Sequence, residues 1–210
     1  MSYFILFLGG LLAYLIGSIP TAYIAGKLVK SIDIRQFGSG NIGATNTFRV
    51  VGKMPGVAVL LIDMLKGYMC VTYCADLFML IAPVERPELY RVLMGLSAIM
   101  GHNWTVFLNF KGGKGVATSA GVIIALIPKI FLLGLIVWSI IFGLTGYVSL
   151  SSIIAAILIP IFTFLFNKPV ETIVAMCILC MVVVYKHRSN IARLKKGEER
   201  KIKLFKKGKK

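Results

Sequence analysis

Three polar stretches interrupt an otherwise apolar chain, and each is rich in groups that bind anions. The first reads GSGNIGATNTFR over residues 38–49, the second GHNWTVFLNFKGGKGVAT over 101–118, and the third HRSNIARLKKGEERK over 187–201. Glycine amides, side-chain amides and hydroxyls, and Lys and Arg side chains are the donors with which proteins hold phosphate. The residue types therefore indicate chemistry on anionic, phosphate-bearing substrates.

The first stretch is suited to presenting backbone N–H groups to an anion. Glycines allow successive amides to converge on one ligand, and the closing Arg49 carries a planar guanidinium that pairs with phosphate. Ser39 is expected to donate to phosphate or to a developing oxyanion; no base lies beside it in sequence to make it a nucleophile. A solvated polar turn is the alternative. The residues expected to bind or act here are Gly38, Ser39, Gly40, Asn41, Gly43, Thr45, Asn46 and Arg49.

The same glycines, Gly38, Gly40 and Gly43, also spell G-x-G-x-x-G, and Asp63 follows twenty residues later. This is the fingerprint of a dinucleotide site, which requires a strand before it and a helix after it. Here an apolar run long enough to span a membrane precedes the glycines. The context excludes a nicotinamide-binding fold.

In the second stretch two lysines flank a pair of glycines, just before a predicted helix start at Val116. The spacing is not that of a Walker A loop, but free amides at a helix N-terminus favour an anion. A basic loop that only sets membrane topology is the alternative. The residues expected to hold a substrate phosphate are Lys111, Gly112, Gly113, Lys114 and Gly115.

The third stretch places His187, Asn190 and Arg193 three residues apart, on one face of a helix if the helix continues. A histidine at the membrane surface can titrate near neutral pH. Glu199 and Lys201 follow, and we expect all five residues to serve the site. For Lys203–Lys210 we expect only attraction to anionic lipid.

One charged pair lies inside an apolar segment. Asp63 and Lys66 are one helical turn apart, and charges within a membrane are costly and usually functional. An i,i+3 pair can also partly neutralise itself, so a structural role remains equally open.

Composition defines the elements that must position these residues. The chain has 210 residues, of which 58% are hydrophobic, with a net charge of +16 and a mean hydropathy of +0.85. These values exclude a soluble globular protein and indicate an all-α integral membrane protein. We expect seven transmembrane helices, near residues 3–26, 55–81, 89–108, 116–127, 129–147, 148–166 and 169–186.

Charge sets the expected orientation. With seven spans most of the 24 Lys and Arg share one side, which the positive-inside rule makes cytoplasmic. The N-terminus is then outside and the C-terminus in the cytoplasm, in a single domain over residues 1–210 with a basic tail at 187–210. All three polar stretches face the cytoplasm, where we expect them to form one cationic pocket.

Taken together, the three stretches resemble the acyl-phosphate-dependent glycerol-3-phosphate acyltransferases of bacterial membranes. That family carries GSGN-x-G-x-TN-x-x-R, GH…F…FKGGKG-V-AT and H-x-x-N-x-x-R-x-x-x-G-x-E-x-K, all present here in order. The resemblance implies transfer of a fatty acyl group from acyl phosphate to the 1-hydroxyl of glycerol-3-phosphate in phospholipid synthesis. It also implies a multi-pass protein of the bacterial inner membrane whose partners are these substrates and membrane lipids, with no nucleic acid.

The chemistry of the residues agrees with that implication. An acyl phosphate is already activated, so we expect direct attack by the glycerol hydroxyl, whose proton passes to His187 or to the departing phosphate. With eight Asp and Glu and no cluster of them in the three stretches, neither a metal nor another cofactor is expected. His102 could act as a catalytic base, but the familiar glycerolipid acyltransferase signature has an Asp five residues after its His, and Phe107 stands at that position here. A structural role for His102 is therefore favoured over proton transfer.

Two other classes would use some of these features. An organic-phosphate transporter places its site near the membrane midplane, often between inverted repeats, and no repeat is visible in the sequence. A lipid-binding scaffold would not need the serine, asparagine and histidine positions.

Overall fold

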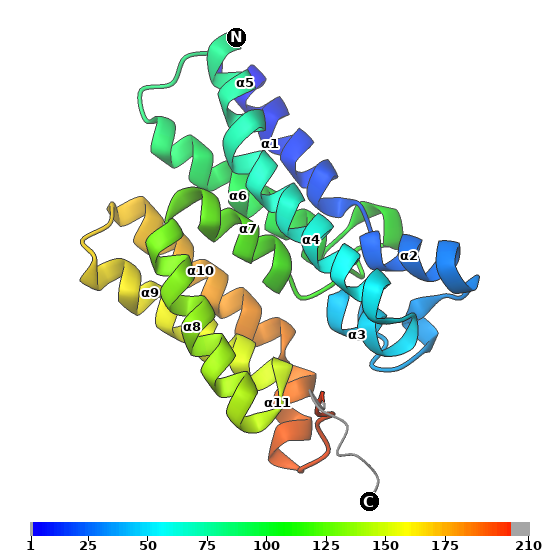
Figure 1. Cartoon of the computed structure of the whole chain (residues 1–210). Helices are drawn as coiled ribbons and strands as arrows, with labels where there is room; N and C mark the ends of the chain where they lie inside the picture. Colours follow the sequence, from blue (N-terminus) through cyan, green and yellow to red (C-terminus); the bar gives the residue numbers. More distant parts are fainter. Residues whose placement is uncertain (1, 203–210) are drawn as a thin grey trace, which may run out of the picture. The chain divides into compact units, whose positions relative to one another are not determined.

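The computed structural model describes residues 2–202, and within that range the chain is helical with no strand. It forms two compact units, Met1–Pro128 and Lys129–Lys210 (Figure 1). The first contains α1 (Ser2–Ser18), α2 (Thr21–Lys30), η1 (Ile34–Gln36), α3 (Ala44–Val50), α4 (Lys53–Met69), the π-helical turn η2 (Cys70–Cys74), α5 (Ala75–Ile81), α6 (Pro87–Asn103), η3 (Val106–Leu108) and α7 (Val116–Leu126). The second contains α8 (Pro128–Thr145), which begins at the boundary between the units, α9 (Val148–Leu165), α10 (Val170–Lys186) and α11 (Arg188–Lys195).

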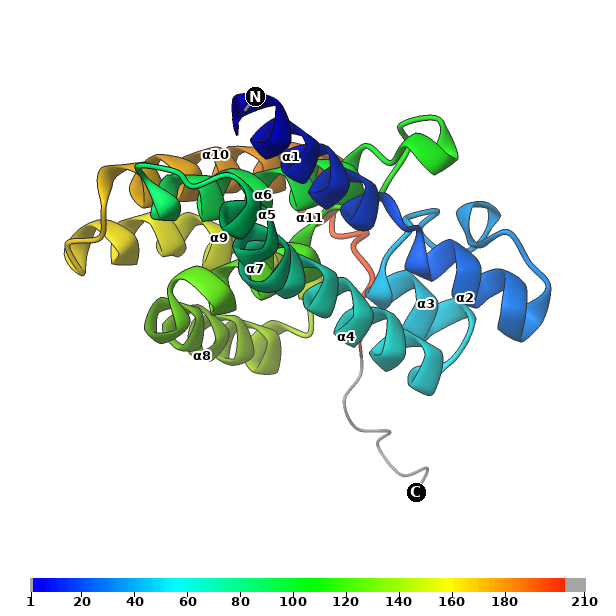
Figure 2. The same cartoon turned by 90° about the horizontal axis from the view of Figure 1, so that it is seen from above.

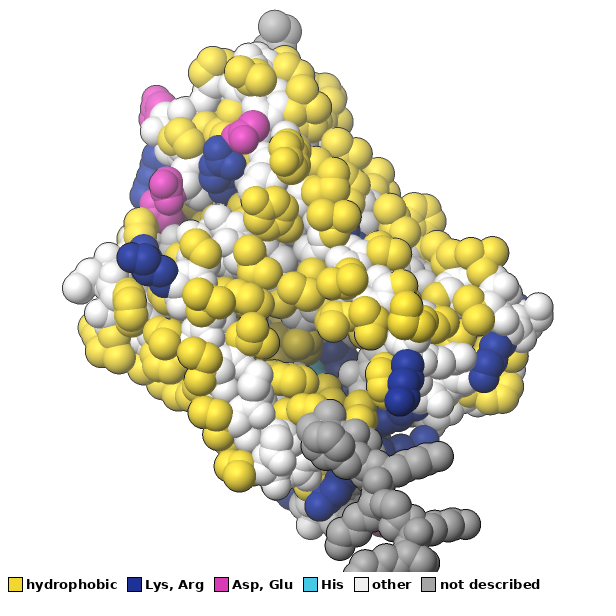
Figure 3. Space-filling model, in the orientation of Figure 1, with side chains coloured by type: hydrophobic (Ala, Val, Ile, Leu, Met, Phe, Trp, Pro, Cys, Tyr) yellow, Lys and Arg dark blue, Asp and Glu magenta, His cyan; other side chains and the backbone are white. Residues whose placement is uncertain are grey.

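The helices carry large apolar side chains outward, as a bilayer requires. Phe4 is 63% exposed, Leu80 82% and Leu144 79%, and hydrophobic side chains cover most of the face drawn in Figure 3. On this face the acidic side chains gather near the α5–α6 end, with Lys and Arg side chains beside them, and further Lys and Arg side chains appear over α2 and α3. The predicted all-α membrane architecture is confirmed.

Four stretches within residues 2–202 are long and apolar enough to cross a membrane: Tyr3–Lys30, Lys53–Ile81, Pro128–Thr145 and Val148–Leu165. A fifth results if α10 and α11, bent by 56° at His187, form one span. The shorter α7 is separated from α8 at Ile127. The number of seven spans and the orientation in the membrane stay predictions.

The first apolar segment, predicted as a span near residues 3–26, forms a candidate span over Tyr3–Lys30, but its helix is interrupted. It breaks between α1 and α2 because Pro20 has no N–H and disfavours helical backbone in Ile19. The carbonyl groups at the break are bound elsewhere: Thr105 Oγ1 donates to the Ser18 oxygen at 2.6 Å and Lys66 Nζ to the Ile19 oxygen at 3.1 Å. The break therefore brings polar groups into an apolar unit.

Two close helix pairs fix the ends of α6 and α7. A Cβ on Gly17 would lie 2.0 Å from the Ala98 oxygen, and one on Gly101 would lie 2.0 Å from the Tyr14 oxygen, so α1 and α6 approach backbone to backbone. A Cβ on Gly121 would likewise meet the α4 backbone at 1.9 Å. Small residues permit such packing in membranes, and here they hold the two ends between which the 104–115 loop runs.

The α4 helix continues through its π turn into α5 as one rod (Figures 1 and 2). The short α2 and α3 pack beside its N-terminal end, which is visible in both views. A Cβ on Gly56 would approach Phe48 to 2.6 Å, and Lys30 Nζ donates to the Val50 oxygen at 2.8 Å. These contacts hold α3, the helix that carries Arg49.

In the second unit α9 and α10 pack together, and the chain after α11 returns to the α8–α9 turn. Ile202 N donates to the Gly146 oxygen at 2.9 Å, and the Lys201 ammonium lies 5.0 Å from the Tyr147 ring centroid. The predicted lipid-binding segment Lys203–Lys210 lies outside the described residues.

Candidate active site

The first glycine stretch is a turn held from within by Asn46. The Asn46 amide is 1% exposed; its oxygen accepts from Ser39 N at 2.9 Å, and its nitrogen donates to the oxygens of Ile34 and Phe37 at 3.3 and 3.1 Å. Gly38 has φ +64°, and a Cβ there would lie 2.3 Å from the Asn46 oxygen. These contacts place Asn46 to shape the loop, and its predicted part in substrate binding stays a prediction.

The turn leaves its other polar groups outward. Ser39 is exposed and Asn41, Thr45 and Arg49 are half-buried. Thr47 uses its hydroxyl within α3, donating to the Gly43 oxygen at 3.1 Å. The loop thus presents the Ser39 hydroxyl at its surface on a backbone that Asn46 keeps in place.

The second glycine stretch is tied to the end of α6. Asn109 and Phe110 have positive φ values, and Phe110 N donates to the Thr105 oxygen at 2.8 Å. Gly113 N donates to the His102 oxygen at 3.0 Å. Lys111 is exposed and Lys114 half-buried. The lysines therefore stand on a loop whose backbone is anchored on both sides.

Gly113 brings the two stretches into contact. A Cβ on Gly113 would lie 2.6 Å from the Ile42 oxygen and 2.2 Å from His102 Nε2, so no larger residue fits there. A small pocket of about 10 Å³, with room for about one water molecule, lies beside the contact and is lined by residues 18–21, Ile42, His102, Thr105, Gly112 and Gly113. The structure thus joins two segments separated by about seventy residues of sequence at one pocket.

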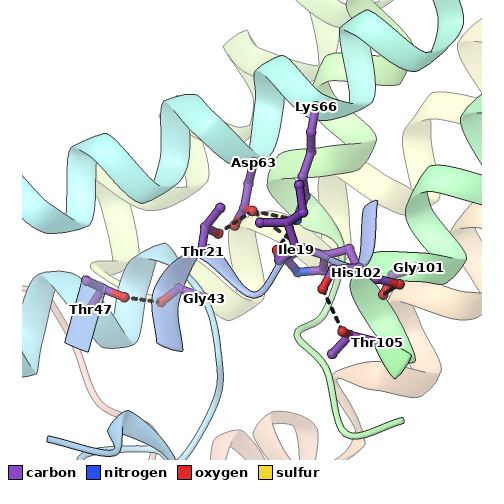
Figure 4. A network of polar contacts seen from close by, with 10 residues as sticks. Ile19, Thr21, Gly43, Thr47, Asp63, Lys66, Gly101, His102 and Thr105 are labelled. Carbon is purple, nitrogen blue, oxygen red and sulfur yellow. Dashed lines mark hydrogen bonds and ion pairs between the residues drawn. The ribbon is translucent and has the colours of Figure 1, made fainter. Parts of the chain in front are cut away.

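A buried charged cluster borders the same pocket (Figure 4). Lys66 Nζ lies 2.8 Å from Asp63 Oδ1, and the two side chains are 5% and 1% exposed. Thr21 Oγ1 donates to the same carboxylate oxygen at 2.6 Å, and His102 Nδ1 lies 3.6 Å from it. The Asp63–Lys66 pair faces the interior of the unit, with partners from α2 and α6.

In the second unit the third stretch is organised by Glu199. Its Oε1 accepts from Ser149 Oγ at 2.7 Å and from Asn190 Nδ2 at 2.6 Å, while Oε2 accepts from Arg193 Nε at 2.7 Å. Burial raises the pKa of this carboxyl group. The three hydrogen bonds and the Arg193 charge together lower it by more than burial raises it, so the pKa of Glu199 is below its ordinary value. Glu199 is placed as a hub that orients two predicted site residues.

The helix does not continue straight through this stretch as the three-residue spacing had assumed. It bends by 56° at His187, where α10 ends and α11 begins. His187 is 3% exposed, and its Nδ1 lies 2.8 Å from the Val183 oxygen. Asn190 and Arg193, by contrast, do share a face, because both reach Glu199.

Several residues that support the site were not predicted from the sequence. Thr21 and Thr105 satisfy groups at the helix break, and Ser149 lies forty residues from the stretch that it supports. The polar pair Ser18 and Thr21 on either side of Pro20, within an apolar run, was the available signal for the break.

The fold and these loops define a multi-pass helical membrane protein in which two glycine-rich polar loops, one of them carrying Lys111 and Lys114, meet. A family model described as glycerol-3-phosphate acyltransferase matches residues 7–197. A glycerol-3-phosphate acyltransferase of Fusobacterium nucleatum is 45% identical over 195 residues, which cover 92% of this chain and 96% of that protein. One of Bacillus cytotoxicus is 43% identical over 206 residues, covering 98% and 100%. The chain belongs to the glycerol-3-phosphate acyltransferase family.

Solved structures agree with this assignment. The chain is similar to PlsY (YgiH), an integral membrane glycerol 3-phosphate acyltransferase, in its glycerol 3-phosphate form, with 38% identity and a TM-score of 0.85 over 94% of this chain and 96% of that one. The lysophosphatidic acid form of that protein gives 37% identity and a TM-score of 0.82, covering 94% and 95%. The family resemblance predicted from the three stretches is confirmed.

Proposed function

We propose that this protein transfers a fatty acyl group from acyl phosphate to the 1-hydroxyl of glycerol-3-phosphate. The products are 1-acyl-glycerol-3-phosphate and inorganic phosphate. Family membership supports the acceptor, and the three motifs support the donor. The observation that carries the proposal is the contact between the two glycine stretches at Ile42 and Gly113, which lies beside a small pocket; the two stretches also carry Arg49, Lys111 and Lys114.

Both substrates are phosphate dianions, and their repulsion is the main electrostatic obstacle. Two unit charges 4 Å apart repel by about 4 kcal/mol near a protein surface, and dianions multiply this. Arg49, Lys111 and Lys114 are proposed to neutralise the phosphates, with the glycine amides of residues 38–43 and 112–115 as further donors. Each fixed donor that strengthens its bond in the transition state contributes to rate rather than to binding alone.

The proposed chemistry is one displacement at the acyl carbon. The glycerol oxygen bonds to that carbon, the carbon–oxygen bond to phosphate breaks, and the phosphate leaves with the electron pair. The hydroxyl proton passes to the departing phosphate or to His187. If His187 donates from Nδ1 to the Val183 oxygen, its accepting lone pair is on Nε2, which is the form a base requires.

Asn190, Arg193 and Lys201 are proposed to serve the same reaction, with Glu199 fixing the first two. This role rests on the motif that they share with the family and on the order that the Glu199 hub imposes. The proposal includes a single functional domain, seven spans, an outside N-terminus, and an active site on the cytoplasmic face of the bacterial inner membrane. Acyl chains would reach the site from the bilayer.

Activity of the purified protein tests the proposal. Detergent-solubilised protein is given palmitoyl phosphate and glycerol-3-phosphate, and inorganic phosphate and acylated product are measured beside the Arg49→Ala variant. We expect both products from the wild type and a reduction of about 10²-fold or more in the variant. A folded wild-type protein that releases no more phosphate than the variant would refute the proposal, and acylation from palmitoyl-CoA would refute the donor.

A further inference from the structure

The buried cluster around Asp63 has no part in the displacement described above. The free-energy cost of burying its charges therefore needs an explanation. Removing two charges from water is expensive even when they pair, and apolar residues of similar size often replace such pairs without loss of stability. The Asp63–Lys66 pair lies within an apolar helix with side chains no more than 5% exposed. Stability alone is therefore a weak explanation for it.

The contacts of the cluster reach three residues that line the pocket, Ile19, Thr21 and His102. Lys66 binds the Ile19 oxygen at the α1–α2 break, and Asp63 binds the Thr21 hydroxyl just beyond it. The same carboxylate oxygen lies 3.6 Å from His102 Nδ1. Three segments, the helix break, α4 and the end of α6, thus meet at the Asp63 carboxylate (Figure 4).

His102 extends this connection to the lysine–glycine loop. Its carbonyl oxygen accepts the Gly113 N–H at 3.0 Å, and its Nε2 would lie 2.2 Å from a Cβ on Gly113. The residue therefore touches Gly113 through both backbone and ring. One ring nitrogen faces Asp63 and the other faces Gly113, and the side chain is only 8% exposed. Because both ring nitrogens face groups of the protein, a positioning role is favoured over proton exchange with a substrate.

We propose that Asp63 and His102 are positioning residues that set the 111–115 loop for binding a substrate phosphate, with Lys66 and Thr21 holding the Asp63 carboxylate. The inference rests on the proposed function, since it assigns the loop a phosphate of that reaction. Asp63 on α4 orients the His102 ring, the ring contacts Gly113, and the placement of Gly113 sets that of the flanking lysines. A misplacement of about 1 Å at a reacting group can cost about 10²-fold in rate.

Kinetics of three changes test the role: His102→Ala, His102→Gln, and the double change Asp63→Asn with Lys66→Met. The double change removes both charges together, so that neither is left buried alone. We expect His102→Ala to raise the KM of one phosphate substrate by about 10- to 100-fold, with a smaller change in kcat. His102→Gln keeps a side-chain donor and should recover part of the loss. Thr163→Val, which removes a buried hydroxyl that donates to the Ile159 oxygen of its own helix, is the matched control.

Coupling to the loop distinguishes positioning from a general effect on the fold. If His102 acts through the loop, His102→Ala combined with Lys111→Ala should raise KM by less than the product of the two single effects. Multiplying effects, an unchanged KM in all three variants, or a loss confined to kcat would overturn the inference. The last outcome would instead indicate proton transfer by His102.

Hydrogen exchange provides a readout that does not depend on turnover. In His102→Ala and in the Asp63→Asn, Lys66→Met double variant, we expect amides of residues 104–115 to exchange at least about tenfold faster. Amides of α9 should remain as in the wild type, and the thermal unfolding midpoint should match that of Thr163→Val within a few degrees. Unchanged exchange in 104–115 would overturn the inference even if the wild type transfers acyl groups. Faster exchange in a protein without acyltransferase activity would refute the proposed function alone.

Discussion

Replacing Gly113 by alanine should disable the protein without unfolding it. The new Cβ would lie 2.2 Å from His102 Nε2 and 2.6 Å from the Ile42 oxygen, where ordinary contacts are 3.4–4 Å. The ring and the carbonyl would each have to retreat by about 1 Å, which corresponds to a loss of about 10²-fold in rate when it displaces reacting groups. Because the ring belongs to α6 and the carbonyl to the first stretch, relief at one side cannot remove the clash at the other.

Gly143→Ala is the matched control for that change. Gly143 lies in α8, and an added Cβ there has nothing within 4 Å. Alanine inside a helix is favoured over glycine by about 0.5–1 kcal/mol, so this variant should keep full activity and stability. Both variants are assayed for phosphate release from palmitoyl phosphate, with thermal unfolding in detergent measured alongside. Equal activity of the two variants would show that the contact at Ile42 and His102 does not organise the site.

Three further predictions follow from the loops and from the Glu199 hub. Asn46→Ala leaves the Ser39 N–H and two carbonyls without their amide partner, so kcat/KM should fall by about 10²-fold or more; wild-type activity would show that the turn holds its shape unaided. Lys111→Ala and Lys114→Ala should each raise the KM of a phosphate substrate by about tenfold or more, measured by varying each substrate in turn, and unchanged kinetics in both would assign the loop to topology alone. The folded-state pKa of Glu199 is lowered, so its stabilisation is complete above the unfolded value of about 4.3 and disappears as the pH falls through the folded value. Glu199→Gln should therefore lower the unfolding temperature at pH 7 and flatten its decline in acid; parallel pH profiles for variant and wild type would contradict this.

The sequence predicted the helical segments better than their interruptions. Apolar runs locate helices because a bilayer demands about 20 apolar residues per span, and α4 through α5 ends at Ile81 as expected. The break at Pro20 was missed because hydropathy averages over it, although Pro in an apolar run carried the signal. The 56° bend at His187 had no such signal, since no Pro or Gly stands there.

The candidate site shows the same division between local and distant information. The glycine–lysine loops were visible because their residue types are tied to anion binding wherever they occur. That Asn46 points into its own turn depends on its contact with Ser39, which lies in a non-helical turn before α3, so helical periodicity does not predict it. The approach of His102 to Asp63 joins α6 to α4 and required the packing of both helices, so the sequence left the roles of Asp63 and His102 open.

The proposed reaction is tested most directly by the identity of the acyl donor. Purified protein should be offered glycerol-3-phosphate with either palmitoyl phosphate or palmitoyl-CoA at equal concentration, and 1-acyl-glycerol-3-phosphate should be quantified for the wild type and for Arg49→Ala. We predict product from palmitoyl phosphate alone, matched mole for mole by inorganic phosphate and lost in the variant. Product from palmitoyl-CoA, or product formation that Arg49→Ala leaves intact, would contradict it.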